Sequence, residues 1–352
     1  MSSDFFTPIV KKEKQHFNFV QMTEDKHSAV KDTFNQWARG FVDRDGKLVK
    51  EFQTTFNSTF WEVYLHAIFK EGGHSVDYSY DRPDFVVKKD DIEFCVEAVI
   101  SNHRRGDVPE WHHDTFNDGT RKSKSPEQYA LMNKSAMIRH WNAVLSKWEQ
   151  YAKNYSKLDH VKDKPFVIAV GAYDNPDAWE EMDRAIMATL FDFYLDEQDF
   201  FDGEYPIGEE VPIKSLGAVK NHNNADICLG LFNSPKLEDI SAVAFSCTST
   251  MGKLRALSPI GEGVNIFSYT WMTESGPLYN TSMQGQEVLG DGLMIFHNPF
   301  AKRPLPKEAF MIDGVVQFFF DEEDVNGYTT YANGPRMIQR CTARLNFVNR
   351  IK

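Results

Sequence analysis

Two short apolar segments separated by charged residues dominate the pattern of hydrophobic and polar positions along the chain. Residues 82–87 and 92–100 are rich in Val, Ile and Phe, and residues 88–91 read Lys-Lys-Asp-Asp. This pattern predicts two β-strands joined by a hairpin turn. Glu97 lies in the middle of the second strand, and Asp84 lies at the start of the first.

The position of Glu97 is unusual because the strand around it is apolar enough to be buried on both faces. A buried carboxylate stays charged only when it has a cationic partner, hydrogen bonds or a metal. A hairpin that brings Asp84 beside Glu97 would supply half of a site for a hard cation. The sequence therefore predicts that the two carboxylates lie together on adjacent antiparallel strands.

A helix is predicted at residues 56–73, with capping residues at its start and two glycines at its end. Its apolar face is formed by Trp61, Tyr64, Leu65 and Ile68. Glu62 falls at the edge of that face. It is either a solvated helix charge or a carboxylate that leans over the apolar rim toward the site of Asp84.

A second, longer helix is predicted at residues 126–153, with an apolar stripe that runs from Met137 to Tyr151. At 100° per residue, Lys134 falls near the centre of that stripe, whereas Lys147 falls outside it. Lys134 either snorkels from its place near the helix start or directs its ammonium toward an anion across the sheet.

The remaining apolar segments predict an α/β fold. Residues 164–173 form a strand that is apolar on both faces, so the long helix before it is a crossover connection. Further helices are expected at 23–39 and 177–194, and further strands at 225–232, 240–246, 292–297 and 315–320. We expect three parts, packed as one domain: an N-terminal arm and helix (1–55), a core (56–175) and an α/β to β-rich extension (176–352).

Composition is that of a soluble globular protein, since 41% of the residues are hydrophobic and 26% are charged. No apolar run has the length of a membrane span and the first residues lack a signal-sequence pattern, so no membrane contact is expected. Four widely separated cysteines without a C-x-x-C pair indicate reduced thiols and a cytoplasmic location. The net charge of −12 argues against a general nucleic-acid coat but permits a local basic groove.

A long polar loop at residues 101–126 carries most of the local basic charge. Such loops in compact proteins are usually functional or disordered. The side chains that we expect to contact nucleic-acid phosphates are Arg104, Arg105, Arg121, Lys122 and Lys124. The histidines of this loop have no regular spacing and no cysteine partner, so a zinc site is not expected.

Three of these features together resemble the PD-(D/E)xK nuclease superfamily: the helix with Glu62, the Pro83-Asp84 pair, and the strand that carries Glu97-Ala98-Val99. The resemblance covers residues 56–172. It implies a restriction-endonuclease-like αβββαβ core, with a mixed sheet flanked by helices, to which the β-rich C-terminal extension is added. It also implies metal-dependent hydrolysis of nucleic-acid phosphodiesters, with DNA favoured over RNA, in restriction or phage defence.

The resemblance assigns the metal to Asp84, Glu97 and the Ala98 carbonyl, with Glu62 as an outer or second-metal ligand. The expected metal is Mg²⁺, with Mn²⁺ as an alternative. The superfamily has a lysine at the position of Val99, and valine cannot polarise the attacking water. We therefore expect a lysine from a neighbouring element to replace it, and Lys134 is the candidate.

Two other interpretations stay open at the level of sequence. One is a nuclease-like scaffold that has lost cleavage and serves as a binding or regulatory module. The other treats the three acidic residues as structural charges of an unrelated α/β enzyme or interaction protein. No Ser-His-Asp elbow, P-loop or dinucleotide fingerprint favours a different enzyme class. Nucleic acid is the expected partner, and a homodimer is left open.

Overall fold

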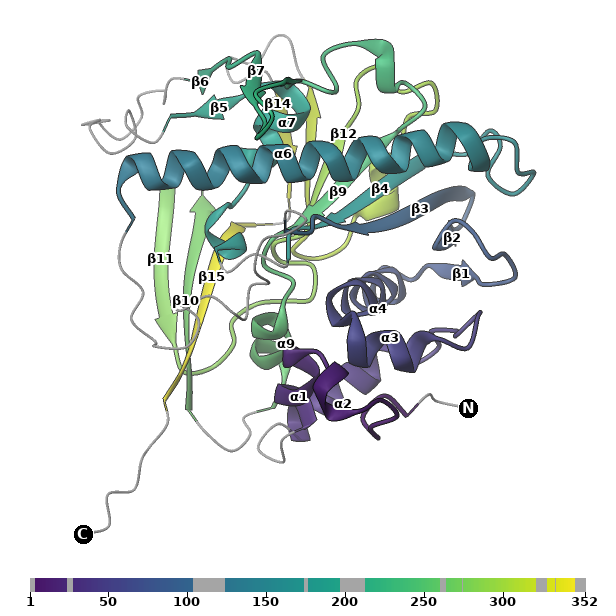
Figure 1. Ribbon diagram of the computed structural model, residues 1–352, viewed down its shortest axis with the longest axis vertical. Coiled ribbons are helices and arrows are strands. Elements are labelled where there is room, and N and C mark those ends of the chain that lie inside the picture. The colour runs from purple at the N-terminus through teal and green to yellow at the C-terminus, as the bar shows by residue number, and fades with distance from the viewer. Residues whose placement is uncertain are drawn as a thin grey trace.

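The structure is a computed structural model, and it describes residues 4–23, 28–103, 124–173, 177–196, 213–259, 264–273, 275–320, 328–332 and 334–345. A mixed α/β architecture with one large sheet flanked by helices forms its centre (Figure 1). Within the described ranges, no helix combines the length and apolarity needed to cross a lipid bilayer.

The central sheet has eight strands in the order β1-β2-β3-β4-β9-β12-β13-β14. The neighbours β3 and β4, β4 and β9, and β12 and β13 are parallel, and the other neighbouring pairs are antiparallel. The strands are β1 (Ser75–Asp77), β2 (Phe85–Lys89), β3 (Ile92–Ile100), β4 (Phe166–Gly171), β9 (Ala242–Ser246), β12 (Met294–His297), β13 (Val316–Phe320) and β14 (Tyr328–Tyr331).

Helices cover both faces of this sheet (Figure 1). One face carries α6 (Pro126–Gln150) and α7 (Arg184–Phe191). The other carries α1 (Phe17–Thr23), α2 (Ser28–Trp37), α3 (Leu48–Thr54), α4 (Phe56–Glu71) and α9 (Met251–Leu257). The alternation along β3 explains this arrangement, because Phe94 and Val96 pack in the core with α4 while Cys95 packs in the core with α6.

The long helix α6 begins with a capping box, in which the Ser125 hydroxyl accepts the Gln128 N–H and the Gln128 side chain accepts the Ser125 N–H. Pro126 occupies its first turn, where its missing N–H is not needed. At its C-terminal end the helix continues into a π-helical turn, η4 (Tyr151–Tyr155). Turns of this kind re-aim side chains, and they are frequent at functional sites.

A second, antiparallel sheet has the order β11-β10-β15 and lies beside the central layer (Figure 1). Its strands are β10 (Val264–Thr273), β11 (Gly276–Ser282) and β15 (Arg336–Leu345). Two small hairpins pair β5 (Tyr194–Leu195) with β6 (Ile213–Lys214) and β7 (Ala218–Lys220) with β8 (Asp226–Cys228). Short 3-10 turns are η1 (Lys12–Lys14), η5 (Ala178–Glu180), η6 (Pro235–Leu237) and η7 (Lys307–Phe310).

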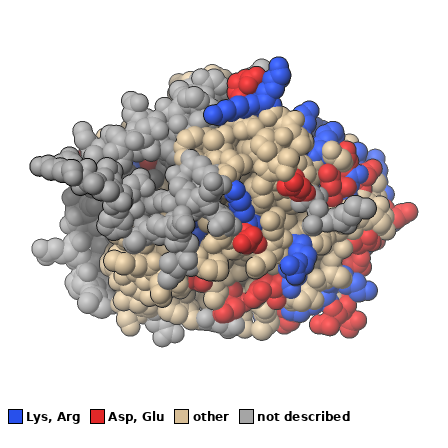
Figure 2. Space-filling view, turned by 90° about the horizontal axis from the view of Figure 1, so that it is seen from below, with Lys and Arg blue, Asp and Glu red and all other residues tan. Residues whose placement is uncertain are grey.

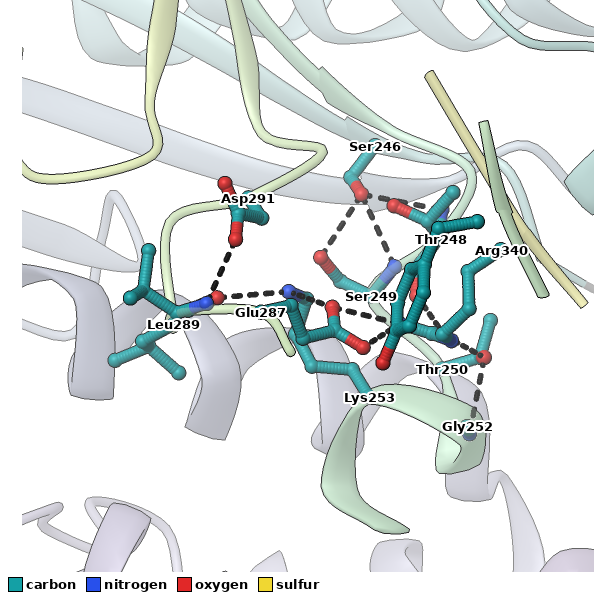
Figure 3. Close-up of polar contacts among 12 residues, drawn as sticks. Ser246, Thr248, Ser249, Thr250, Gly252, Lys253, Glu287, Leu289, Asp291 and Arg340 are labelled. Carbon is teal, nitrogen blue, oxygen red and sulfur yellow. Dashed lines mark hydrogen bonds and ion pairs between the residues drawn. The ribbon is translucent and has the colours of Figure 1, made fainter. Parts of the chain in front are cut away.

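A buried ionic cluster joins the second sheet to the central layer (Figure 3). Glu287 accepts Lys253 Nζ at 2.6 Å and Arg340 Nη1 at 2.9 and 3.0 Å, and none of the three side chains is more than 2% exposed. Arg340 also donates to the Thr248 carbonyl, beyond the end of β9. Arg340 approaches so closely that a Cβ at Gly252 would lie 2.8 Å from its guanidinium, so a larger residue there would displace the Arg340 side chain.

Most predicted elements are confirmed, including the 56–73 helix, the hairpin, the long helix and the strand that follows it. The helix predicted at 23–39 is confirmed in part, because α2 spans Ser28–Trp37, whereas Thr23, the predicted start, is the last residue of α1. The helix predicted at 177–194 divides into η5 and the shorter α7.

Candidate active site

The β2–β3 hairpin brings Asp84 opposite Glu97. In its register Phe85 pairs with Val96, so the next position beyond β2 faces Glu97. The Asp84 N–H lies 3.4 Å from Glu97 Oε2, and Asp84 Oδ2 accepts the Ala98 N–H at 2.7 Å. The two carboxylates therefore lie together at one end of the hairpin, as the sequence predicts.

Glu97 is held by groups from the end of α6. Its side chain is 4% exposed, and Oε1 accepts Lys147 Nζ at 2.7 Å. The Tyr155 hydroxyl, presented by the π-helical turn η4, donates to the same oxygen at 3.3 Å. A buried carboxylate is thus compensated by one ammonium and one hydroxyl.

The lysine that contacts Glu97 is Lys147, whereas Lys134, the lysine that the sequence analysis expected there, does not line the cavity of Asp84. The two lysines are 13 residues apart on α6, which corresponds to about 20 Å along the helix axis. The first half of α6 packs on α7 and the β7–β8 hairpin through Met137 and Ile138, whereas Ala143 and Val144 pack over the central sheet. Only the second half of the helix therefore carries side chains that reach Glu97.

Glu62 of α4 lines the same cavity of about 500 Å³ as Asp84, Ala98 and Lys147. Burial, followed by the charge of Asp84, raises the pKa of Glu62 to about 8. Burial, followed by the charge of Glu97, raises the pKa of Asp84 to about 7. Both shifts favour the protonated carboxyl groups, so binding of a cation there would be linked to release of protons.

Arg44 fixes the chain at the start of β2, and the sequence analysis did not identify it. Its guanidinium donates to the carbonyls of Tyr80 at 2.7 Å and Pro83 at 3.1 Å. It also lies 3.9 Å from Asp84 Oδ1, so it contributes positive charge beside the carboxylate. Because it comes from the segment before α3, no local motif connects it with the hairpin.

The donor set suits a hard cation, with oxygen atoms as its only ligands. Within the described part of the chain, no group of three or more His, Cys, Asp or Glu side chains is arranged to hold a metal ion. The candidate ligands are therefore the Asp84 and Glu97 carboxylates and the Ala98 carbonyl. The Ala98 N–H faces Asp84. In an extended strand the N–H and C=O of one residue point to the same neighbouring strand, so the Ala98 carbonyl also points to the side of Asp84.

Four of the five residues predicted to contact phosphates lie outside the part of the chain that the structure describes. They are Arg104, Arg105, Arg121 and Lys122. Lys124 is ion-paired with Asp177 at 3.0 Å and Glu180 at 2.9 Å, so its charge is already compensated. Figure 2 shows one face on which described Lys and Arg side chains are interspersed with Asp and Glu, without a continuous basic surface among them.

Comparisons of the chain with protein-family models, with curated proteins and with solved structures found no match.

Proposed function

We propose that the protein is a Mg²⁺-dependent phosphodiesterase that cleaves nucleic acid and has the PD-(D/E)xK arrangement of its core. One observation carries the proposal: the Lys147 ammonium lies 2.7 Å from Glu97, which faces Asp84 across the hairpin. Two carboxylates and a lysine at one cavity are the groups that metal-assisted phosphodiester hydrolysis requires. The chain order α4, β1, β2, β3, α6, β4 further supports it.

Each residue of the site would have a different role in the proposed reaction. Asp84, Glu97 and the Ala98 carbonyl would hold Mg²⁺, which when bound supplies a Lewis acid for the phosphate and its attacking water. Lys147 would orient that water and compensate the charge that develops on the phosphate oxygens. Glu62, with its raised pKa, would take up or release a proton at the cavity wall.

A second candidate function is a nuclease-like scaffold that binds nucleic acid without cutting it. It is favoured by the absence, within the described ranges, of a cluster of three metal-binding side chains. The replacement of the strand lysine by Val99 favours it as well.

A cleavage assay with matched variants separates these candidates. Single- and double-stranded DNA and RNA are incubated with the protein in Mg²⁺, in Mn²⁺ or in EDTA. We expect cleavage only with metal, and a loss of more than about a hundredfold in Glu97→Gln. Glu93→Gln is the control, because Glu93 lies on the same strand but pairs with Lys164 at its other end.

Other results of this assay would favour the scaffold or reject the site. Binding of nucleic acid without cleavage of any substrate supports the scaffold. Neither binding nor cleavage rejects both candidates, and equal activity in Glu97→Gln and Glu93→Gln rejects the site.

A further inference from the structure

A second cavity adjoins the candidate active site. Its volume is about 530 Å³, within the range of small-molecule sites. It shares the wall residues Val99, Ile100 and Asn102 with the cavity that contains Asp84 and Lys147. The two cavities are therefore neighbours along the C-terminal end of β3.

Small uncharged side chains of α6 form one wall of this second cavity. Ser135, Asn142 and Ser146 recur at helical spacing, so they lie along one stripe of the helix. The opposite wall includes Asn221, which follows β7, and Ile227 of β8. Asn142 lies five residues before Lys147, or about 8 Å along the helix axis.

The second cavity carries almost no uncompensated charge. Apart from two histidines, the ionisable residue in its described wall is Arg139. The Arg139 guanidinium donates to the Ser101 carbonyl at 3.0 Å and to the fully buried Glu181 carboxylate. His140 contacts Ser101 Oγ at 2.9 Å and Glu181 at 3.1 Å, and the charge of Arg139 is paired with the Glu181 carboxylate. The cavity is left with neutral hydrogen-bonding groups for a ligand.

We infer that the second cavity receives the base of an unpaired nucleotide whose phosphate lies in the first cavity, an inference that rests on the proposed function. A phosphate belongs in the first cavity, beside the residues that would hold Mg²⁺ under the proposed function. A neutral cavity with amide groups suits the edge of a base instead, and an asparagine amide can pair with adenine through two hydrogen bonds. A base inside a duplex enters such a cavity only after it is unstacked and unpaired, which costs roughly a few kcal/mol, so the substrate class that fits best is single-stranded nucleic acid.

Equilibrium binding tests this inference without any need for cleavage. The probes are a fluorescein-labelled adenine hexadeoxynucleotide and an abasic hexamer with the same backbone. The affinity of each probe for the Lys147→Met variant is measured in Mg²⁺. This variant is used because we expect it to cleave too slowly to degrade the probes. We expect the abasic probe to bind at least about tenfold more weakly, the scale of one lost base contact. An unlabelled duplex of the same sequence should compete at least about tenfold less well than the single strand.

Two further variants, each combined with Lys147→Met, localise the effect. Asn142→Leu should bind both probes equally weakly, since it removes the amide from the wall. Asn35→Leu is the control, because Asn35 is also an exposed helical asparagine but belongs to α2 and lines neither cavity.

The inference is overturned by equal affinity for the two probes, by discrimination that persists in Asn142→Leu, or by a duplex that competes as well as the single strand. Its failure is distinguishable from failure of the nuclease proposal. If the protein cleaves nucleic acid but binds both probes equally, the nuclease proposal stands and the base-binding inference fails. If it prefers the probe with bases but never cleaves, the base-binding cavity stands and the nuclease proposal fails.

Discussion

Replacing Lys147 by methionine is the most direct test of the lysine at the site. Methionine keeps most of the aliphatic stem but removes the ammonium that lies 2.7 Å from Glu97. The side chain of Lys147 is 21% exposed and that of Glu97 is 4% exposed, so the change acts at the rim of a buried carboxylate. We expect the variant to fold and to lose most of its cleavage activity.

The structure sets the size of both effects. Loss of a group that positions or transfers a proton slows catalysis by at least about a hundredfold, or about 2.7 kcal/mol of activation free energy. Removal of one partner of a buried ion pair costs about 3–5 kcal/mol of stability. Here the loss should be smaller, about 1–2 kcal/mol, because Lys147 is partly exposed and Glu97 keeps the Tyr155 hydroxyl at 3.3 Å.

Three measurements read out the variant: the rate of Mg²⁺-dependent cleavage, the free energy of unfolding in urea, and Mg²⁺ affinity by calorimetry. Mg²⁺ affinity should not fall, because the cation no longer competes with an ammonium for Glu97. Lys134→Met is the matched control on the same helix, and we expect it to behave as the wild type. Full activity in Lys147→Met, or an equal loss in Lys134→Met, would refute the assignment.

Two predictions concern stability. The pKa of Asp84 is raised from 3.8 to about 7 on folding, so the metal-free wild type should lose stability as pH rises between these values. The free energy of unfolding of Asp84→Asn should therefore rise relative to that of the wild type by on the order of 1–2 kcal/mol between pH 4 and pH 8, measured by urea titration. If the two proteins show the same dependence of unfolding free energy on pH, the raised pKa is contradicted. In the buried cluster, Glu287→Gln leaves Lys253 and Arg340 without their anion and should cost about 3–5 kcal/mol, whereas Arg340→Met leaves a neutral pair and should cost less. The reverse order in thermal or urea unfolding would show that the cluster is not held by charge.

Local patterns allowed the central elements and the carboxylate pair to be predicted. The hairpin follows from two apolar segments around charged residues, and its register alone brings Asp84 opposite Glu97. The long helix is equally local, since its capping box and apolar stripe lie within its own sequence. A strand with one carboxylate in an apolar run is thus enough to locate the candidate site.

The lysine could not be predicted because helix periodicity does not fix how far a helix extends past its sheet. α6 has 25 residues, about 37 Å, whereas β3 has nine residues, about 30 Å. Its first half packs on α7, outside the central sheet, and this places Lys134 away from Glu97. Lys147 lies at the edge of the apolar stripe, where a long side chain can curl over the rim to the carboxylate.

The second sheet could not be predicted for a different reason. β10 pairs with β15, and about 70 residues separate Val264 from Arg336 along the chain. β10 is rich in apolar and aromatic residues, which favours a strand, but its pairing with β15 depends on long-range register rather than on a local turn. The buried partners Glu287 and Arg340 are 53 residues apart in sequence, so no local pattern connected their charges.

The position of the lysine on α6 rather than on β3 has a consequence for substrate choice. Val99 contributes to the walls of both cavities, whereas Lys147 lines only the one with the carboxylates. A lysine at position 99 would bring its ammonium to the junction and would attract phosphate to both sides. With valine at position 99, the wall that the two cavities share carries no charged side chain among its described residues. Under the proposed function and the inference drawn from it, this uncharged wall is what a base-binding cavity beside a phosphate-binding one would need.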